Sequence, residues 1–453
     1  MSPSSVVTRL RPRSRPYSEA VEAYNSGSFQ FCVDSLSPDE SPRAVALVAR
    51  ALLRLRRPED VIVVVDALLS SGLALAHIEV GELLTHRCAA RTRIGDFRSV
   101  EELFGEAKVP VLASASSALE AEFLSREAYA YLLVGDLAHA ESKARQVLEV
   151  NATLREPDYF SPIEHSRARA HDVLAFVAAR DERYDTQKRH LEYALREFDR
   201  TPVRDDVFEA KLLSNLGLFA VDFGDDGYVR ERFERLPDSA WLAAPRYEIL
   251  RSLAWSSALS GDNLGAFRYL RDAIETADTI PKKMRAALDR AYFARQLKQD
   301  ITAREELDYA ERLSARVDWK AVASDEGELH ALVILSREIA ESLPVRARRL
   351  FEKYKALKRK LPADFLATSD RRARAEELEV DAVISRAEGN LSRAISLFIE
   401  AFEIWNGLGY GVCAGLAARN LVSLGVTERF AAYVEQQCAL RPRSWFAASL
   451  RQA

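Results

Sequence analysis

Residues 124–147 of the chain read LSREAYAYLLVGDLAHAESKARQV, and this stretch carries the pattern on which the fold depends. Before the Gly135-Asp136 pair, apolar residues recur with the spacing of one α-helix face: Leu124, Ala128, Tyr131 and Leu132. After the pair, a second series has helical spacing: Leu137, Ala140, Ala144 and Val147. Glycine accepts a positive φ, so the chain can reverse at Gly135. The stretch therefore predicts two antiparallel helices that pack face to face.

This pattern returns along almost the whole chain, at intervals of roughly 30–47 residues, which is the range of helical-hairpin solenoids. Each repeat has a small residue in its first amphipathic stretch, where two helix axes can approach closely. These residues are Ala20, Ala49, Cys88, Ala128, Ala175, Gly217, Ala254, Ala291, Ala382 and Ala418. The hairpins centre on Gly27, Pro58, Gly95, Gly135, Glu182, Gly224, Gly261, Asp300, Pro344, Gly389 and Gly425. We therefore expect an all-α solenoid of about eleven antiparallel helix pairs, in which the Pro344 hairpin fits least well because Leu335 replaces its small residue.

The expected domain organisation follows from where this periodicity begins and ends. Helical repeats span residues 17–440 without a shift in composition, although 150–163 and 360–371 are the longest gaps between helices. Residues 1–16 are rich in Arg, Ser and Pro and lack the apolar region of a secretory signal peptide. They predict a disordered basic tail, and a transit peptide is the alternative. Residues 441–453 are expected to form a C-terminal capping helix or tail.

Composition indicates a folded, water-soluble chain. Of the 453 residues, 48% are hydrophobic and 29% are charged, which excludes a disordered protein, and the net charge of −4 argues against a dedicated nucleic-acid binder. The four cysteines have no CxxC spacing and read as buried residues of a reducing compartment. Arginine greatly outnumbers lysine, as in GC-rich bacteria. We expect a bacterial, cytoplasmic protein without a membrane segment.

No motif in the sequence points to catalysis. Residues 409–414 (GYGVCA) match a relaxed dinucleotide fingerprint, but the residues before them predict a helix where that motif requires a strand. A Walker A sequence, a GxSxG serine and an HExxH or Cys/His cluster are all absent from the sequence. We therefore expect no enzyme activity, no cofactor and no metal site.

The repeats resemble those of the tetratricopeptide repeat family. The family order of a small residue, a Gly-Asp or Gly-Asn turn and a second small-large-small series is followed most closely by three sets. They are Leu213, Leu216, Gly217, Gly224, Val229 and Phe233; Ala254, Gly261, Ala266, Leu270 and Ala273; and Leu378, Ala382, Gly389, Ala394, Phe398 and Ala401. Most repeats are longer than the family's compact unit and look like those in sensor arms of bacterial regulators. The resemblance implies a right-handed superhelix whose first helices line a concave groove for a peptide or protein.

Several residues are candidates for that groove. Aligned on their glycine turns, four repeats place a glutamate at the same position early in the first helix: Glu82, Glu122, Glu248 and Glu376. A stack of carboxylates there would favour a cationic segment, whereas the alternative is that each acid complements the dipole of its own helix start. Tyr129 and Trp255 directly follow the small residue, a position that faces the groove in the family, and are candidate aromatic anchors.

A second candidate surface is basic. Cations are dense from Arg346 to Lys360, where they would surround the exposed side of one helix: Arg346, Arg349, Lys353, Lys355, Lys358, Arg359 and Lys360. A solvated outer face is the favoured interpretation, and contact with an acidic partner or a phosphate backbone is the alternative.

Together these features predict a non-catalytic scaffold or regulatory module that holds a protein or peptide segment in its concave groove. The alternative is a transcription-related sensor that binds a peptide or small ligand and contacts DNA or RNA polymerase through the basic patch. Nucleic acid is thus a less favoured partner than protein, and no feature of the sequence indicates an oligomeric state.

Overall fold

The structure is a computed structural model, and it describes residues 17–36, 41–150, 162–201, 204–223, 227–236, 243–324, 326–360 and 371–440. Within these ranges the chain forms 22 α-helices and one short 3-10 helix, and contains no strand. In the same ranges, no helix is both long and apolar enough to span a bilayer. The expected tail at 1–16 and the expected cap at 441–453 lie outside the described residues.

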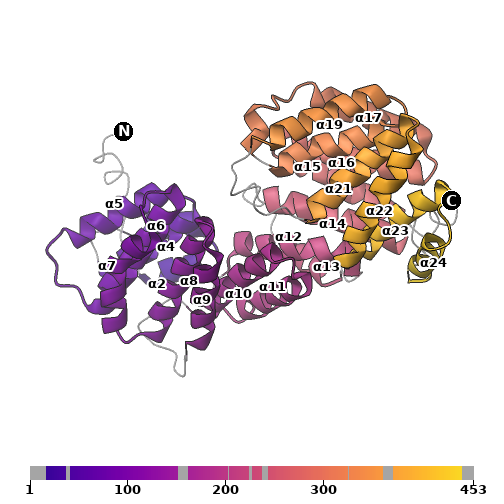
Figure 1. Cartoon of the computed structure of the whole chain (residues 1–453). Helices are drawn as coiled ribbons and strands as arrows, with labels where there is room; N and C mark the ends of the chain where they lie inside the picture. The colour runs from indigo at the N-terminus through magenta and orange to yellow at the C-terminus, as the bar shows by residue number, and fades with distance from the viewer. Residues whose placement is uncertain are drawn as a thin grey trace. The chain divides into compact units, whose positions relative to one another are not determined.

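The helices follow one another as eleven hairpins (Figure 1). Their bounds are α2 (Tyr17–Asn25) with α3 (Phe29–Ser35), α4 (Pro42–Arg54) with α5 (Pro58–Leu69), α6 (His77–Ile94) with α7 (Val100–Ala113), α8 (Ser117–Leu133) with α9 (Leu137–Glu149), α10 (Ile163–Arg180) with α11 (Tyr184–Phe198), α12 (Asp206–Phe223) with α13 (Gly227–Phe233), α14 (Ala243–Ser260) with α15 (Asn263–Thr276), α16 (Ile280–Gln296) with α17 (Asp300–Ser314), α18 (Glu326–Ile339) with α19 (Pro344–Lys358), α21 (Arg371–Ala387) with α22 (Leu391–Gly407), and α23 (Gly411–Ser423) with α24 (Phe430–Leu440). The 3-10 helix η3 (Ala321–Ser324) precedes α18. The predicted all-α fold and the predicted number of helix pairs are confirmed.

The Gly-Asp and Gly-Asn pairs have a specific role in the hairpin turns. Gly135 has a φ of 81° and Gly389 a φ of 82°, a left-handed conformation that ends the first helix at low cost. The residue that follows caps the second helix, because the Asp136 side chain accepts a hydrogen bond from the backbone N–H of His139 at 3.1 Å. Asn390 accepts in the same way from Arg393 at 3.2 Å. One dipeptide therefore both stops a helix and starts the next.

The small residues lie where the sequence analysis placed them. Ala128, Ala254 and Ala382 have no exposed surface, and the second-helix residues Ala140 and Ala394 are equally buried. A side chain longer than a methyl group at these positions would push the helix axes apart. At the Pro344 hairpin the larger Leu335 takes the corresponding place and is also buried, at 1% exposure.

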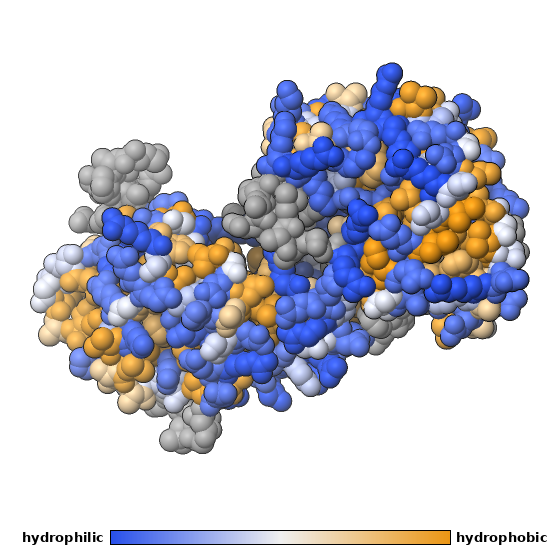
Figure 2. Space-filling model, viewed as in Figure 1, coloured by the Kyte–Doolittle hydropathy of each residue, from blue (hydrophilic) through white to orange (hydrophobic). Residues whose placement is uncertain are grey.

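The chain divides into two compact units, an N-terminal unit of Met1–Leu212 and a C-terminal unit of Leu213–Ala453. The boundary falls inside α12, where the sequence shows no change in composition. The first helices α4, α6, α8 and α10 pack next to one another in the N-terminal unit, and α16, α18 and α21 do so in the C-terminal unit. The surface in Figure 2 is mainly hydrophilic, with hydrophobic residues gathered in smaller areas.

Candidate functional site

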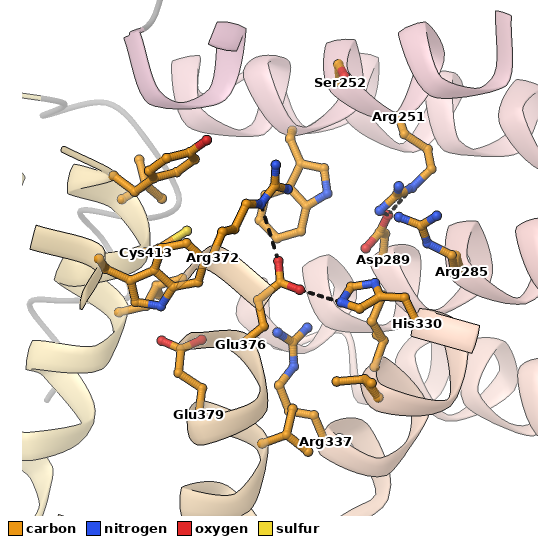
Figure 3. A pocket seen from close by; sticks show the side chains of 18 of the residues that line it. Arg251, Ser252, Arg285, Asp289, His330, Arg337, Arg372, Glu376, Glu379 and Cys413 are labelled. Carbon is orange, nitrogen blue, oxygen red and sulfur yellow. Dashed lines mark hydrogen bonds and ion pairs between the residues drawn. The ribbon is translucent and has the colours of Figure 1, made fainter. Parts of the chain in front are cut away.

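A cavity of about 220 Å³ lies on the inner face of the C-terminal unit (Figure 3). It is bounded by side chains from the first helices of five hairpins, which are α14, α16, α18, α21 and α23, together with Trp405 at the end of α22 and Tyr410 in the following turn. The helical period brings these residues to one side because residues three or four apart share a helix face. The site is therefore a product of the repeat itself.

Two arginines and two carboxylates form one wall of the cavity. The Arg251 guanidinium is 2.8 Å from the Asp289 carboxylate, which is buried, and 3.5 Å from Glu248. Glu248 is also 3.8 Å from Arg285, the residue at its own position in the next hairpin. These ion pairs link α14 to α16 and hold that wall in a fixed arrangement.

Glu376 lies at the centre of the site, between His330 and Arg372 (Figure 3). Its carboxylate is 2.5 Å from Nε2 of His330 and 3.7 Å from Nε of Arg372. Burial by itself would raise the pKa of Glu376, but His330 and Arg372 outweigh that effect and lower the pKa to about 2. Glu376 is therefore ionised at any physiological pH.

Glu379, one turn further along α21, is in the opposite state. It forms no ion pair among the described residues, and burial raises its pKa to about 8. The charge of nearby Glu376 adds to this rise, whereas Arg337 and a hydrogen bond from Trp405 oppose it. The indole Nε1 of Trp405 is buried on the same side of the cavity and faces Glu379. The cavity thus contains a carboxyl that is mostly neutral at pH 7, with a buried indole N–H beside it.

Aromatic rings supply the apolar part of the lining. Trp255 is half-buried and packs edge-to-face on Phe293, with ring centroids 4.7 Å apart, and beside Tyr292 at 5.7 Å. Tyr410 lies on the α23 side, where the Arg372 guanidinium is 5.7 Å from its ring centroid. The rings hold Trp255 in one place, while its remaining exposed surface faces the cavity.

The structure brings together three of the six groove residues that the sequence analysis selected, because Glu248, Trp255 and Glu376 all line this cavity. The other three, Glu82, Glu122 and Tyr129, belong to the N-terminal unit, where Tyr129 is 38% exposed. Their part in binding a ligand stays a prediction.

The glutamates do not form a row of open carboxylates, which differs from the expectation. Glu82 is 2.7 Å from Arg50, and Glu122 is 3.3 Å from both Arg50 and Arg126. Glu122 is only 4% exposed, so a ligand cannot reach it without moving other side chains. The physical reason is that arginines of neighbouring first helices already neutralise these acids.

Sequence reasoning missed those arginines although a signal for them existed. Each selected glutamate lies six residues before the small residue of its repeat, and at the same register the intervening repeats carry Arg169, Lys211 and Arg285. The repeats of Arg169 and Arg285 have no glycine turn, and only the four repeats with a glutamate were compared, so the alternation of acid and base along the inner face was not visible. Glu379, Arg337 and His330 were also missed, and only their helical spacing in the sequence pointed to them.

The predicted basic patch occupies α19. Three of its cations have carboxylate partners: Arg346 with Glu311 at 2.9 Å, Lys355 with Glu352 at 2.5 Å and Lys358 with Glu377 at 2.6 Å. The others, Arg349, Lys353, Arg359 and Lys360, are exposed. Ala347, Phe351, Tyr354 and Leu357 form the buried side of the helix, so the cations do surround its exposed side.

The GYGVCA motif forms the turn between two helices. α22 ends at Gly407 and α23 begins at Gly411, with Gly409 at a φ of 79° between them. The strand that a dinucleotide site requires is replaced by α22.

Comparison with known proteins gives matches among solved structures only, since neither a family model nor a curated protein matches the chain. A Rap protein complexed with Competence and Sporulation Factor is 12% identical over 92% of this chain and 100% of that chain, with a TM-score of 0.42. A human IFIT1 dimer with m7Gppp-AAAA is 14% identical over 97% and 99%, with a TM-score of 0.41. Aspartyl phosphate phosphatase F from Bacillus subtilis is 12% identical over 89% and 94%, with a TM-score of 0.37.

At such identities and scores the repeat type has to be assigned from the hairpins themselves. Their buried small residues in both helices, the left-handed glycine at the turn and the capping Asp or Asn after it are the features on which the resemblance was based. In its described residues the chain is an all-α protein built from helical hairpins that resemble tetratricopeptide repeats.

Proposed function

We propose that the chain is a non-catalytic binding module that holds a peptide, or a segment of a partner protein, in the inner-face cavity of the C-terminal unit. The observation that carries this proposal is the cavity, in which an aromatic wall and the mostly neutral carboxyl of Glu379 face the same space. Binding sites of this kind combine apolar rings that supply affinity with a few polar groups that fix orientation. The role that we propose for the module is regulatory, in a bacterial cytoplasm.

The two ends of the site would contact different parts of the ligand. Trp255 offers an exposed ring edge to an apolar or aromatic side chain, and rings of this type often dominate the free energy of binding. Glu379 offers to a lysine or arginine side chain a carboxyl that forms no ion pair among the described residues. The expected ligand is therefore an amphipathic segment with a cationic residue next to an apolar one.

The ion pairs around the cavity contribute by holding its walls in place. Arg251 with Asp289, and Glu376 with His330, fix side chains that would otherwise lose rotational freedom when a ligand binds. These acids are already neutralised by their partners, so charge recognition falls mainly to Glu379.

Binding of a cation at Glu379 has a testable pH dependence. A cationic ligand favours the ionised carboxylate, which is the minor form below the pKa of about 8. Ionisation then accompanies binding and releases a proton. The affinity should therefore increase as the pH rises from about 6 to about 8 and become constant above that value.

The experiment begins with a displayed library of random twelve-residue peptides, selected on the full chain, followed by fluorescence anisotropy with the best peptide. Trp255→Ala should weaken binding by about tenfold or more, and Glu379→Gln should remove the pH dependence. The control is Leu264→Ala, a change at a residue that is 87% exposed on the second helix α15. Equal affinities for wild type, Trp255→Ala and Glu379→Gln would refute the proposal.

A further inference from the structure

The N-terminal unit contains a separate cluster of charges on the inner faces of its first helices. Arg50 of α4 is paired with Glu82 of α6 at 2.7 Å, and Arg126 of α8 is paired with Glu122 at 3.3 Å. Arg54 contacts Asp205 just before α12. In each pair the acid belongs to the same inner face, so these charges cancel locally.

One further pair lies at the edge of this inner face. Lys211 of α12 is 2.6 Å from the Asp172 carboxylate of α10. With the three pairs already described, four cations are matched by four carboxylates.

Two more arginines of the cluster form no ion pair with an acid among the described residues. Arg169 of α10 has neither a hydrogen bond nor an ion pair among the described residues, and Arg93 of α6 donates only to the backbone carbonyl of Leu53. Burial, together with the positive charges of Arg126 and Arg54, lowers the pKa of both below the ordinary arginine value, to about 10 for Arg93. The cluster therefore has an excess of two positive charges, and both lie near other cations.

Unsatisfied hydrogen-bond donors point to the same place. Nη2 of Arg54 is 2.7 Å from Nε2 of His165, and because an arginine can only donate, Nε2 must accept. The imidazole proton of neutral His165 is then on Nδ1, which is buried without a partner. Nε of Arg126, on a side chain that is 10% exposed, is also buried without a partner. Each such donor destabilises the folded chain unless an acceptor meets it.

We propose that this surface, formed by Arg93, Arg126, Arg169 and His165, binds a phosphate group. An excess of two positive charges matches a phosphate monoester or free phosphate, which carries about −1.5 to −2 charges at pH 7. The oxygens of a phosphate dianion only accept hydrogen bonds. A site for this ion therefore requires N–H donors that lack an acceptor, and no acceptor group that lacks a donor. Protein atoms surround the guanidinium groups, but Arg93 and Arg169 both keep surface in contact with solvent, so an ion from solvent can reach both.

The proposal does not depend on the cavity of the C-terminal unit, and it explains an energetic cost that the fold alone does not. An arginine buried beside other arginines destabilises a protein unless an anion compensates it. A change that removes Arg169 should therefore stabilise the chain and abolish the site together. If Arg169 had a purely structural role, its removal would instead destabilise the chain.

The test is isothermal titration calorimetry of the full chain with inorganic phosphate, phenyl phosphate and acetate, at constant ionic strength. We expect one phosphate per chain in the wild type, binding at least tenfold weaker in Arg169→Gln, and no detectable acetate binding. Arg145→Gln, at a 63% exposed arginine of α9, is the matched control and should bind like the wild type. Tighter binding of phenyl phosphate than of inorganic phosphate identifies a phosphorylated molecule as the ligand, and the reverse order identifies free phosphate.

A thermal melt provides the second measurement. In phosphate-free buffer Arg169→Gln should unfold at a higher temperature than the wild type, and phosphate should raise the midpoint of the wild type and of Arg145→Gln only. The proposal is overturned if phosphate does not bind the wild type, if acetate binds as tightly as phosphate, or if phosphate stabilises Arg169→Gln as much as the wild type.

Discussion

Replacement of Glu379 by glutamine tests the most unusual electrostatic feature of the C-terminal unit. The change keeps the shape of the side chain and removes only its titration. In the folded chain burial raises the pKa of this carboxyl from 4.5 to about 8, whereas in the unfolded chain the ordinary value applies. Between these two values the folded state holds more protons than the unfolded state, so the wild-type free energy of unfolding falls as the pH rises.

The size of the effect follows from the pKa difference. Each unit corresponds to about 1.4 kcal/mol, so the full shift would give roughly 5 kcal/mol as an upper bound. Glu379 is only partly buried and faces a cavity that admits water, which reduces this value. We expect Glu379→Gln to be more stable than the wild type by about 1–3 kcal/mol near pH 9 and similar to it near pH 5.

Urea denaturation followed by far-UV circular dichroism, at about pH 5, 7 and 9, measures this difference. Glu400→Gln is the control, because Glu400 of α22 is 50% exposed and pairs only with the exposed Arg374. Such a pair contributes about 0–1 kcal/mol, and its loss should not depend on pH in this range. If wild type and Glu379→Gln keep a constant difference from pH 5 to pH 9, the raised pKa and the role given to Glu379 are both wrong.

Three further changes test the repeat, the basic helix and a histidine pair. Ala254→Leu adds bulk at a residue with no exposed surface and should cost about 1–3 kcal/mol in urea denaturation, and an unchanged midpoint would contradict the repeat register. Lys355→Glu with Lys358→Glu should leave retention on DNA or RNA columns at low salt as in the wild type, because both lysines already have carboxylate partners, whereas a loss of retention would favour the nucleic-acid alternative. Burial and His190 lower the pKa of His171 to about 4, so the unfolded chain takes up the proton first and the free energy of unfolding falls from about pH 6.5 to pH 4. His171→Gln should reduce this loss of stability in the same denaturation assay. If the stability of His171→Gln falls between these pH values as much as that of the wild type, the histidine is not responsible.

The sequence was sufficient to predict the hairpins because the features that define them are local. A glycine such as Gly261, with a φ of 90°, and the capping Asp262 after it act within a few residues of chain. Even hairpins without glycine were found, since Glu182 and Lys298 take the same left-handed conformation in their turns. Helical periodicity and turn chemistry agree at almost every repeat, and such agreement is what specifies a fold.

The division into two units was not predictable in this way. The boundary after Leu212 lies within a continuous helix, and no proline, glycine or change of charge marks it. Compactness depends on contacts between residues far apart in the chain, and these contacts leave no local signal. The same limit applies to the cavity, whose lining residues Ser252 and Leu416 are separated by much of the C-terminal unit.

The groove residues show most clearly what register can and cannot predict. Register selected Glu248 and Trp255, which both line the cavity, but it did not show that Arg285 of the next hairpin would lie 3.8 Å from Glu248. The charge that a ligand meets is the sum over neighbouring helices, not the property of one aligned position. The N-terminal unit keeps an excess of arginine around Arg169, while the C-terminal cavity keeps an uncharged Glu379. Under the two proposals above, one repeat pattern presents an anion site in one unit and a cation site in the other. The residue at each inner position can be acidic or basic, because the buried alanines stabilise the fold in either case.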